Sequence, residues 1–434
     1  MAETHDVADL SLAEAGAGRI AWAAGQMPVL AKVTSRFADA RPLAGVKVAA
    51  CLHVTAETAA LMRALRVGGA EVALCSANPL ATQDDVAAAL VVEDGIHVRA
   101  RHNESFEEYE AHIERTAAFA SDGRRSWVTL DDGADLLLAA IRSRPPGVER
   151  IPGLIGGTEE TTTGLLRLRR MHASGGLPCP VLAVNEARTE RALNDRHGTG
   201  QSALDGIMRA TNVLLAGHTV VVLGYGWAGQ GVAERARGAG AVVIVCEVDP
   251  LRALEARMAG YEVLPALSAA ARGDVFITVT GSRRVLRAEH FERMKDGALL
   301  ANAGHFDVEI DLADLRAAAV EEAKQVRPLV EQFQLADGRR LNLLARGRVV
   351  NLAAAEGHPA AVMDVSFALQ ALSVEALVRD PSAFSAGVHA VPSEIDLEVG
   401  RLKLAALGVE IDAPTSEQDD YRAAWDLNPS AKIF

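Results

Sequence analysis

A glycine-rich segment carries the clearest chemical signal in the sequence. Gly224, Gly226 and Gly229 form a GxGxxG pattern that follows the apolar run at 219–223 and precedes a stretch of helical character. In that context the first glycine permits a tight turn, the second lets the backbone approach a pyrophosphate, and the third allows close packing of helix and strand. The phosphates then meet the helix N-terminus, so the pattern predicts a dinucleotide site.

A carboxylate in the next apolar run indicates which dinucleotide binds. Glu247 lies about 20 residues after Gly226, where a carboxylate accepts hydrogen bonds from both hydroxyls of the adenosine ribose and repels a 2′-phosphate. We therefore expect NAD, and Arg252 keeps NADP open as an alternative. The other reading is an ordinary glycine turn with Glu247 as a solvated charge, but strand, turn, helix and acid stand in the required order.

Two series of alternating segments must position these residues. Short β-branched runs alternate with Ala/Leu/Arg-rich segments of helical period, which is typical of βαβ units and parallel sheets. The first series includes runs at 46–52, 71–76, 126–133 and 180–186, and the second starts at 219. We expect an α/β protein with two doubly wound parallel-sheet domains, one of them a Rossmann-like NAD domain and the other a substrate domain.

The length of the chain also favours two domains and a small appendage, because 434 residues exceed what one hydrophobic core usually serves. We place the substrate-binding domain at 1–195, completed by 356–408, where helical period returns. The NAD-binding domain is expected at 196–355. The polar, proline-containing tail at 409–434 is expected to form a short C-terminal arm for oligomerisation.

The composition excludes several classes of partner. Apolar residues make up 49% of the chain and charged residues 23%, which is typical of a globular protein. The net charge of −13 is spread without a basic block, so nucleic acid and anionic membrane surfaces are excluded as partners. A small-molecule ligand is expected.

The cysteines and the N-terminus indicate the compartment. Cys51, Cys75, Cys179 and Cys246 lie far apart without CxxC spacing, so we expect reduced, buried thiols and neither a disulfide framework nor a bound metal. The opening MAETHDVADL lacks the basic and apolar regions of a signal peptide, and no segment was expected to reach the ~20 apolar residues of a membrane span. The expected location is the cytoplasm.

Six further segments resemble S-adenosylhomocysteine hydrolase: CLHVTAETA (51–59), ATQDD (81–85), LDDGAD (130–135), EETTTG (159–164), GHFDVEID (304–311) and VNLAAAEGHP (350–359). The resemblance runs from about residue 5 to about residue 410 and follows the family's order. It implies two α/β domains that close over the substrate and an arm that reaches a neighbouring subunit of a homotetramer. It also implies tightly held NAD that is used and regenerated in each turnover.

The family's chemistry explains these motifs. NAD takes a hydride from C3′ of an adenine nucleoside, the ketone acidifies the C4′ proton, a base removes that proton and the 5′ substituent leaves; water then adds and the ketone is reduced. By resemblance, His53, Asp132 and Glu160 are acid/base groups near C4′ and C5′. The resemblance assigns adenine binding to Thr55, Glu57 and His358, NAD binding to Thr161, Thr162, Thr163, Asp195 and Asn351, and the lining of the closed site to His305.

Each of these residues also has a plainer reading. His53 and His358 are equally compatible with hydrogen-bonded core histidines, and Asp132 with a cap in an Asp/Gly turn. The coincidence of six motifs in the family's order favours the catalytic interpretation.

One segment departs from the family. Where the family has TKSKFDN, this chain has TERALND at 189–195, so a lysine becomes Glu190, an aspartate becomes Asn194 and an asparagine beside the nicotinamide becomes Asp195. The first change reverses the charge by about two units at the position that assists oxidation at C3′. Further changes at the same end of the substrate are Ala77, Ala134 and Thr199.

The departure suggests a nucleoside with an altered sugar. We expect catalytic roles for Glu190 and Asn194 at that sugar, and a reaction that ends after elimination of water and reduction of the ketone. Dehydration of psicofuranine to decoyinine, in antibiotic biosynthesis, is one example. The alternatives are reversible hydrolysis of S-adenosylhomocysteine to adenosine and homocysteine, and an inactive NAD-binding regulator. The sequence identifies neither the sugar nor the leaving group.

Overall fold

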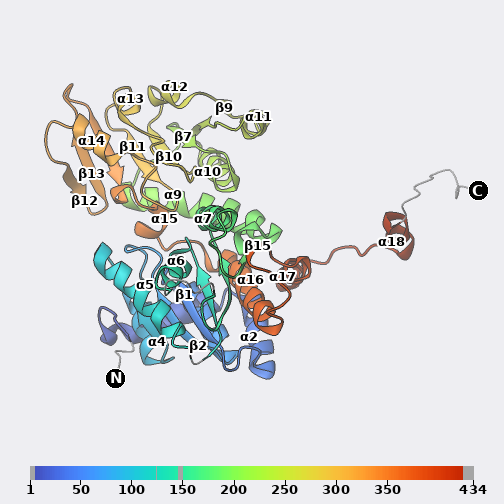
Figure 1. The fold of residues 1–434 in the computed structure, drawn as a ribbon. Helices are drawn as coiled ribbons and strands as arrows, with labels where there is room; N and C mark the ends of the chain where they lie inside the picture. The colour runs from blue at the N-terminus through green and yellow to red at the C-terminus, as the bar shows by residue number, and fades with distance from the viewer. Residues whose placement is uncertain (1–4, 124, 145–149, 424–434) are drawn as a thin grey trace, which may run out of the picture.

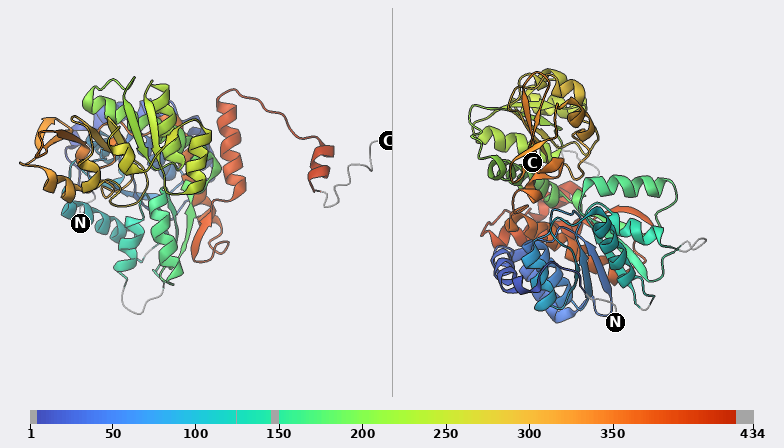
Figure 2. Two further views of the ribbon diagram at one scale, coloured as in Figure 1. Left: turned by 90° about the horizontal axis from the view of Figure 1, so that it is seen from above. Right: turned by 90° about the vertical axis from the view of Figure 1, so that its left-hand side faces the viewer.

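The computed structural model describes residues 5–123, 125–144 and 150–423, which form two α/β domains (Figure 1). Each domain has a mainly parallel sheet with helices packed on its faces. The right-hand view in Figure 2 shows the second domain above the first, with connecting segments between them. The predicted fold class is confirmed.

The first sheet has seven strands, all parallel, in the order β15-β6-β5-β4-β1-β2-β3. Its strands are β1 (Lys47–Cys51), β2 (Glu71–Cys75), β3 (His97–Arg99), β4 (Trp127–Asp131), β5 (Leu154–Glu159), β6 (Pro180–Ala183) and β15 (Gly387–Ala390). β1 and β4 are buried along their whole length, because helices cover both faces of the sheet.

The helices of this domain are α1 (Ala13–Ala24), α2 (Pro28–Ala40), α3 (Ala56–Val67), α4 (Asp84–Val92), α5 (Phe106–Ala120), α6 (Asp135–Arg142), α7 (Thr162–Ala173), α8 (Arg188–Glu190), α16 (Ala360–Arg379) and α17 (Ser393–Ala406). α16 returns from the second half of the chain and shares one hydrophobic core with α2, α3 and β1. A late segment of the sequence therefore builds the wall of the first domain.

The second sheet has eight strands in the order β12-β13-β14-β11-β10-β7-β8-β9, and only the pairs of β13 with β12 and β14 are antiparallel. Its strands are β7 (Thr219–Leu223), β8 (Val242–Cys246), β9 (Glu262–Val263), β10 (Val275–Thr278), β11 (Leu299–Asn302), β12 (Lys324–Arg327), β13 (Val330–Gln334) and β14 (Arg340–Leu344). The strand order reverses beside β7, which is the topological switch point where a Rossmann sheet binds its ligand.

The helices around this sheet are α9 (Thr199–Thr211), α10 (Trp227–Gly238), α11 (Pro250–Met258), α12 (Ala266–Ala270), α13 (Ala288–Phe291), α14 (Leu312–Ala318) and α15 (Val350–Ala353). A π-helical segment, Arg191–Gly198, leads from α8 into α9 and packs against both α10 and α16. The segment that departs from the family therefore lies between the two domains.

α16 corrects one expectation. Among the described residues, α16 is long and apolar enough to span a membrane by length and composition alone. However, 72% of its most apolar 18-residue stretch is buried inside the protein. The helix is apolar because it fills the core of the first domain, and periodicity alone does not separate a buried helix from a membrane span.

The described part of the tail ends in α18 (Ser416–Ala423), which has no buried residue and lies away from both domains (Figures 1 and 2). The proposed role of 409–434 as an oligomerisation arm stays a prediction. Residues 424–434 of this tail, including its lysine, Lys432, lie outside the described residues.

Candidate active site

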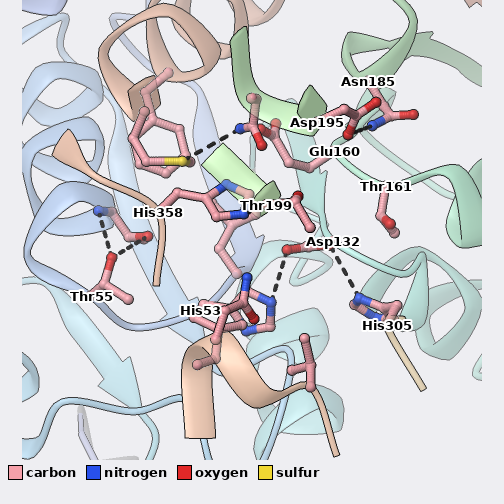
Figure 3. Close-up of a pocket in the computed structure, with 18 of the residues that line it drawn as sticks. His53, Thr55, Asp132, Glu160, Thr161, Asn185, Asp195, Thr199, His305 and His358 are labelled. Atoms are coloured by element: carbon pink, nitrogen blue, oxygen red, sulfur yellow. Dashed lines mark hydrogen bonds and ion pairs between the residues drawn. The ribbon is translucent and has the colours of Figure 1, made fainter. Parts of the chain in front are cut away.

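A cavity of about 160 Å³ lies between the domains, where the carboxyl ends of several strands meet. Asp132 follows β4, Glu160 follows β5 and His305 follows β11, while His53 lies between β1 and α3. These four side chains line the cavity together (Figure 3). The structure thus brings four of the predicted catalytic residues to one place from both domains.

Asp132 joins the two histidines. Its Oδ2 lies 3.1 Å from His53 Nε2, and its Oδ1 lies 3.6 Å from His305 Nδ1 (Figure 3). Burial opposes ionisation of Asp132, but the charge and hydrogen bond of His53, with smaller effects of His305 and His358, lower its pKa to about 2. Asp132 is therefore a carboxylate at neutral pH, and it orients His53.

Glu160 has the opposite electrostatic environment. Burial, together with the charges of Asp132 and Asp195, raises its pKa to about 8 against the effect of a hydrogen bond from Gln370. Gln370 Nε2 donates to Glu160 Oε2, and Glu160 Oε1 is buried without a partner. Glu160 can therefore hold a proton and release it near neutral pH, as a general acid/base requires.

The predicted adenine-binding residues are only partly brought together. Thr55 and His358 line the cavity, and His358 Nε2 lies 3.3 Å from Thr199 Oγ1. Burial, with the charge of His53, lowers the pKa of His358 to about 4, so its imidazole is neutral. Glu57, the second residue of α3, is not among the residues that line the cavity.

Glu190 and Asn194, both expected to act on the sugar, differ in their position relative to the cavity. Asn194 lines the cavity, whereas Glu190 is 1% exposed and is not among the lining residues. Ser366 Oγ donates a hydrogen bond of 2.5 Å to Glu190 Oε2, and it accepts one of 2.7 Å from Asn194 Nδ2. Burial and the charge of Glu160 raise the pKa of Glu190. Glu190 therefore reaches Asn194 only through Ser366, and its catalytic role at the sugar stays a prediction.

A larger groove of about 1100 Å³ runs over the second sheet. The predicted cofactor residues that line it are Thr161, Thr162, Thr163, Asp195, Gly224, Gly226 and Glu247. Gly229 contributes by packing, because a Cβ there would overlap the carbonyl oxygen of Gly224. Asn351 lines the smaller cavity instead, where its Oδ1 is buried without a partner.

The glycine loop fits a dinucleotide. Gly224 has φ +107°, which favours glycine, and a Cβ on Gly226 would meet only the Arg252 side chain, which leaves open space for phosphates. The carboxylate of Glu247 accepts hydrogen bonds from the backbone N–H groups of Tyr225, Val248 and Asp249. It is therefore fixed at the end of β8. These residues would hold NAD with its adenosine ribose beside Glu247.

The groove and the cavity are continuous. Six residues line both: Thr161, Asn185, Asp195, Thr199, Ala303 and His305. Asn185 Nδ2 donates to Asp195 Oδ1 at 3.3 Å, and burial raises the pKa of Asp195 to about 6. A nicotinamide at this junction would lie beside a ligand in the cavity.

Sequence reasoning missed Asn185 and four residues of α16: Met363, Ser366, Phe367 and Gln370. A signal for them exists. Ser366 and Gln370 are polar residues four apart in a mostly apolar helix, and such residues need partners when they are buried.

The residue types at the centre of the cavity also suit a metal. One ligand atom each of His53, Asp132 and His305 lies within 4.8 Å of the others, whereas the sequence predicted no metal site. Imidazole and carboxylate are ligands of zinc. In this structure the same atoms form the His–Asp contacts already described.

The fold and the site define a two-domain, NAD-binding α/β enzyme with acid/base groups beside the nicotinamide end of the groove. Comparison with known proteins specifies the family. Residues 195–357 match the model "S-adenosyl-L-homocysteine hydrolase, NAD binding domain", and residues 4–145 match "S-adenosyl-L-homocysteine hydrolase". The chain belongs to the S-adenosylhomocysteine hydrolase family, and it uses NAD.

Curated relatives cover almost the whole chain. The adenosylhomocysteinase of Aquifex aeolicus is 54% identical over 97% of this chain and 99% of its own length. The adenosylhomocysteinase of Thermosynechococcus vestitus is 52% identical over 97% of this chain and 96% of its own length. The S-inosyl-L-homocysteine hydrolase of Methanopyrus kandleri is 51% identical over 97% and 97%.

Proposed function

We propose that the protein oxidises the sugar of an adenine nucleoside with its NAD, expels the substituent at C5′, adds water to the resulting double bond when the net reaction is hydrolysis, and then reduces the ketone. The observation that carries this proposal is the convergence of His53, Asp132 and Glu160 in a cavity continuous with the dinucleotide groove. NAD, when bound, supplies the hydride acceptor and the hydride donor.

The side chains supply the proton transfers. Elimination needs a base for the C4′ proton and an acid for the leaving group, and the two buried carboxyl groups of the cavity have pKa values near 2 and 8. Glu160 acts as the base in its ionised form, which a pKa of about 8 makes available near neutral pH, and takes the sugar proton through Oε1, which has no partner. His53, held by Asp132, exchanges a proton at C5′.

The comparisons support hydrolysis of a homocysteine thioether as the net reaction. Relatives 54% and 52% identical to this chain are named adenosylhomocysteinase, and their similarity covers both domains. This supports S-adenosylhomocysteine hydrolysis better than the dehydration expected from the sequence. Because another relative is named for an inosine nucleoside, the purine base must also be varied in a test.

A second candidate, dehydration of a nucleoside with an altered sugar, has one specific observation in its favour. The residues that line the cavity include no lysine or arginine in the described part of the chain, and the acid Glu190 lies behind its sugar end. A buried acid does not lower the pKa of a sugar hydroxyl as a cation would. A sugar with a different hydroxyl arrangement would suit this charge distribution better.

The deciding experiment gives the NAD-loaded protein S-adenosylhomocysteine, S-inosylhomocysteine and psicofuranosyl adenine separately, with products read by mass. Release of homocysteine would establish hydrolysis, and loss of water from psicofuranosyl adenine would establish dehydration. If no nucleoside reduces the nicotinamide, the proposal fails and an NAD-binding regulator remains. Glu160→Gln serves as the control that should form no product.

A further inference from the structure

Helix α16 carries two buried polar side chains that the proposed chemistry does not use. Ser366 and Gln370 are 0% exposed and stand one helical turn apart on the same face. Each contacts a buried glutamate: Ser366 contacts Glu190, and Gln370 contacts Glu160. Polar groups in a core destabilise the fold unless they are paired, so these two contacts need an explanation.

Ser366 fixes the orientation of an amide in the cavity wall. A serine hydroxyl has one proton to donate, and Ser366 donates it to Glu190 Oε2 at 2.5 Å. Its oxygen therefore accepts from Asn194 Nδ2 at 2.7 Å. The amide NH₂ of Asn194 is turned toward α16, which leaves Asn194 Oδ1 for a ligand in the cavity that Asn194 lines.

Gln370 does the same for the neighbouring acid. Its Nε2 donates to Glu160 Oε2, so that oxygen is held against α16, while Glu160 Oε1 is buried without a partner. Glu160 lines the same cavity as Asn194. Helix α16 thus binds Asn194 Nδ2 and Glu160 Oε2 through hydrogen bonds. The remaining side-chain oxygen of each residue, Asn194 Oδ1 and Glu160 Oε1, is left for a ligand.

We propose that Ser366 and Gln370 are specificity-determining positioning residues, which keep Asn194 Oδ1 and Glu160 Oε1 turned toward the sugar. Asn194 Oδ1 can then accept a hydrogen bond from a sugar hydroxyl, and Glu160 Oε1 faces the sugar carbon whose proton it takes. The inference rests on the proposed function in that an adenine nucleoside is taken as the ligand.

Calorimetric titration of the NAD-loaded protein with adenosine and, separately, with adenine tests this inference. Ser366→Ala and Gln370→Met should each weaken adenosine binding about tenfold and leave adenine binding within about twofold, because only the sugar contacts lose their orientation. The matched control is Ser373→Ala, since Ser373 lies on the same helix, is fully buried, and has a hydroxyl without a partner. The control should bind both ligands like the wild type.

Ser366→Thr, which keeps the hydroxyl, should restore adenosine binding, and retained NAD in each variant shows that the domains still fold. Unchanged adenosine affinity in both alanine and methionine variants would overturn the inference. Equal loss of adenosine and adenine would overturn it too, because α16 would then only maintain the shape of the cavity. If the wild type binds adenine but not adenosine, the proposed function itself fails.

Discussion

Replacement of Asp132 by Asn should separate oxidation of the sugar from product formation. The pKa of Asp132 is lowered from 3.8 to about 2, chiefly because His53 outweighs the effect of burial. A shift of about two units corresponds to about 2.5 kcal/mol of coupling, or about 60-fold in an equilibrium. The amide cannot provide this coupling, so His53 loses the charged partner that orients its ring.

We therefore expect Asp132→Asn to lower the rate of product formation by at least about 60-fold, and loss of acid/base catalysis typically costs more, about 10²- to 10⁴-fold. Nicotinamide reduction should persist, because oxidation precedes proton removal. The assay mixes NAD-loaded protein with adenosine, S-adenosylhomocysteine or psicofuranosyl adenine, follows NADH absorbance and quantifies products by mass.

Asp135→Asn is the matched control, because Asp135 lies in the same segment but pairs with Arg167 and does not line the cavity. The control should reduce nicotinamide and form product at rates near those of the wild type. Product formation by Asp132→Asn at the wild-type rate would refute the acid/base role. Loss of nicotinamide reduction together with product would instead place Asp132 in binding or oxidation.

Three further predictions concern the cofactor, stability and the sugar. Glu247→Ala should purify without NAD, because the ribose hydroxyls lose a charged acceptor; unchanged occupancy would contradict the assignment. Glu160 holds a proton in the folded state that the unfolded state releases, so its contribution to stability is full below about pH 4 and is lost as pH rises toward about 8. Glu160→Gln should therefore flatten the decline in Tm between about pH 5 and pH 9, and an unchanged slope would count against the raised pKa. If Glu190 and Asn194 arose by neutral drift, Glu190→Lys with Asn194→Asp should improve cleavage of S-adenosylhomocysteine. If they are an adaptation, the same double variant should lose on the order of 2 to 4 kcal/mol of transition-state stabilisation, measured as a lower kcat/KM on psicofuranosyl adenine.

The sequence was sufficient for the features that depend on local order. A β-strand, a glycine turn and a helix are contiguous at 219–238, and Glu247 lies at the end of the next strand, so spacing alone predicted the cofactor site. The carboxyl ends of β4 and β5 likewise place Asp132 and Glu160 at one edge of the sheet.

Features that depend on tertiary packing were not predictable in this way. Ser366 and Gln370 reach Glu190 and Glu160 only because α16 returns across the first domain from a point far along the chain. A motif gives the order of residues and not the direction of their side chains. It could not show that Glu190 contacts Ser366 and does not line the cavity, whereas Asn194, in the π-helical segment that follows, does line it.

Exchange of the C4′ proton tests the central claim most directly, because only an oxidised sugar makes that proton acidic. NAD-loaded protein is incubated in D₂O with adenosine and with psicofuranosyl adenine, and recovered nucleoside is examined by NMR. We predict transient NADH absorbance and deuterium at the acidified ring carbon of at least one nucleoside, which is C4′ of adenosine and the corresponding C5′ of psicofuranosyl adenine, both absent with adenine alone. Recovery of both nucleosides without deuterium and without any NADH signal would contradict the account.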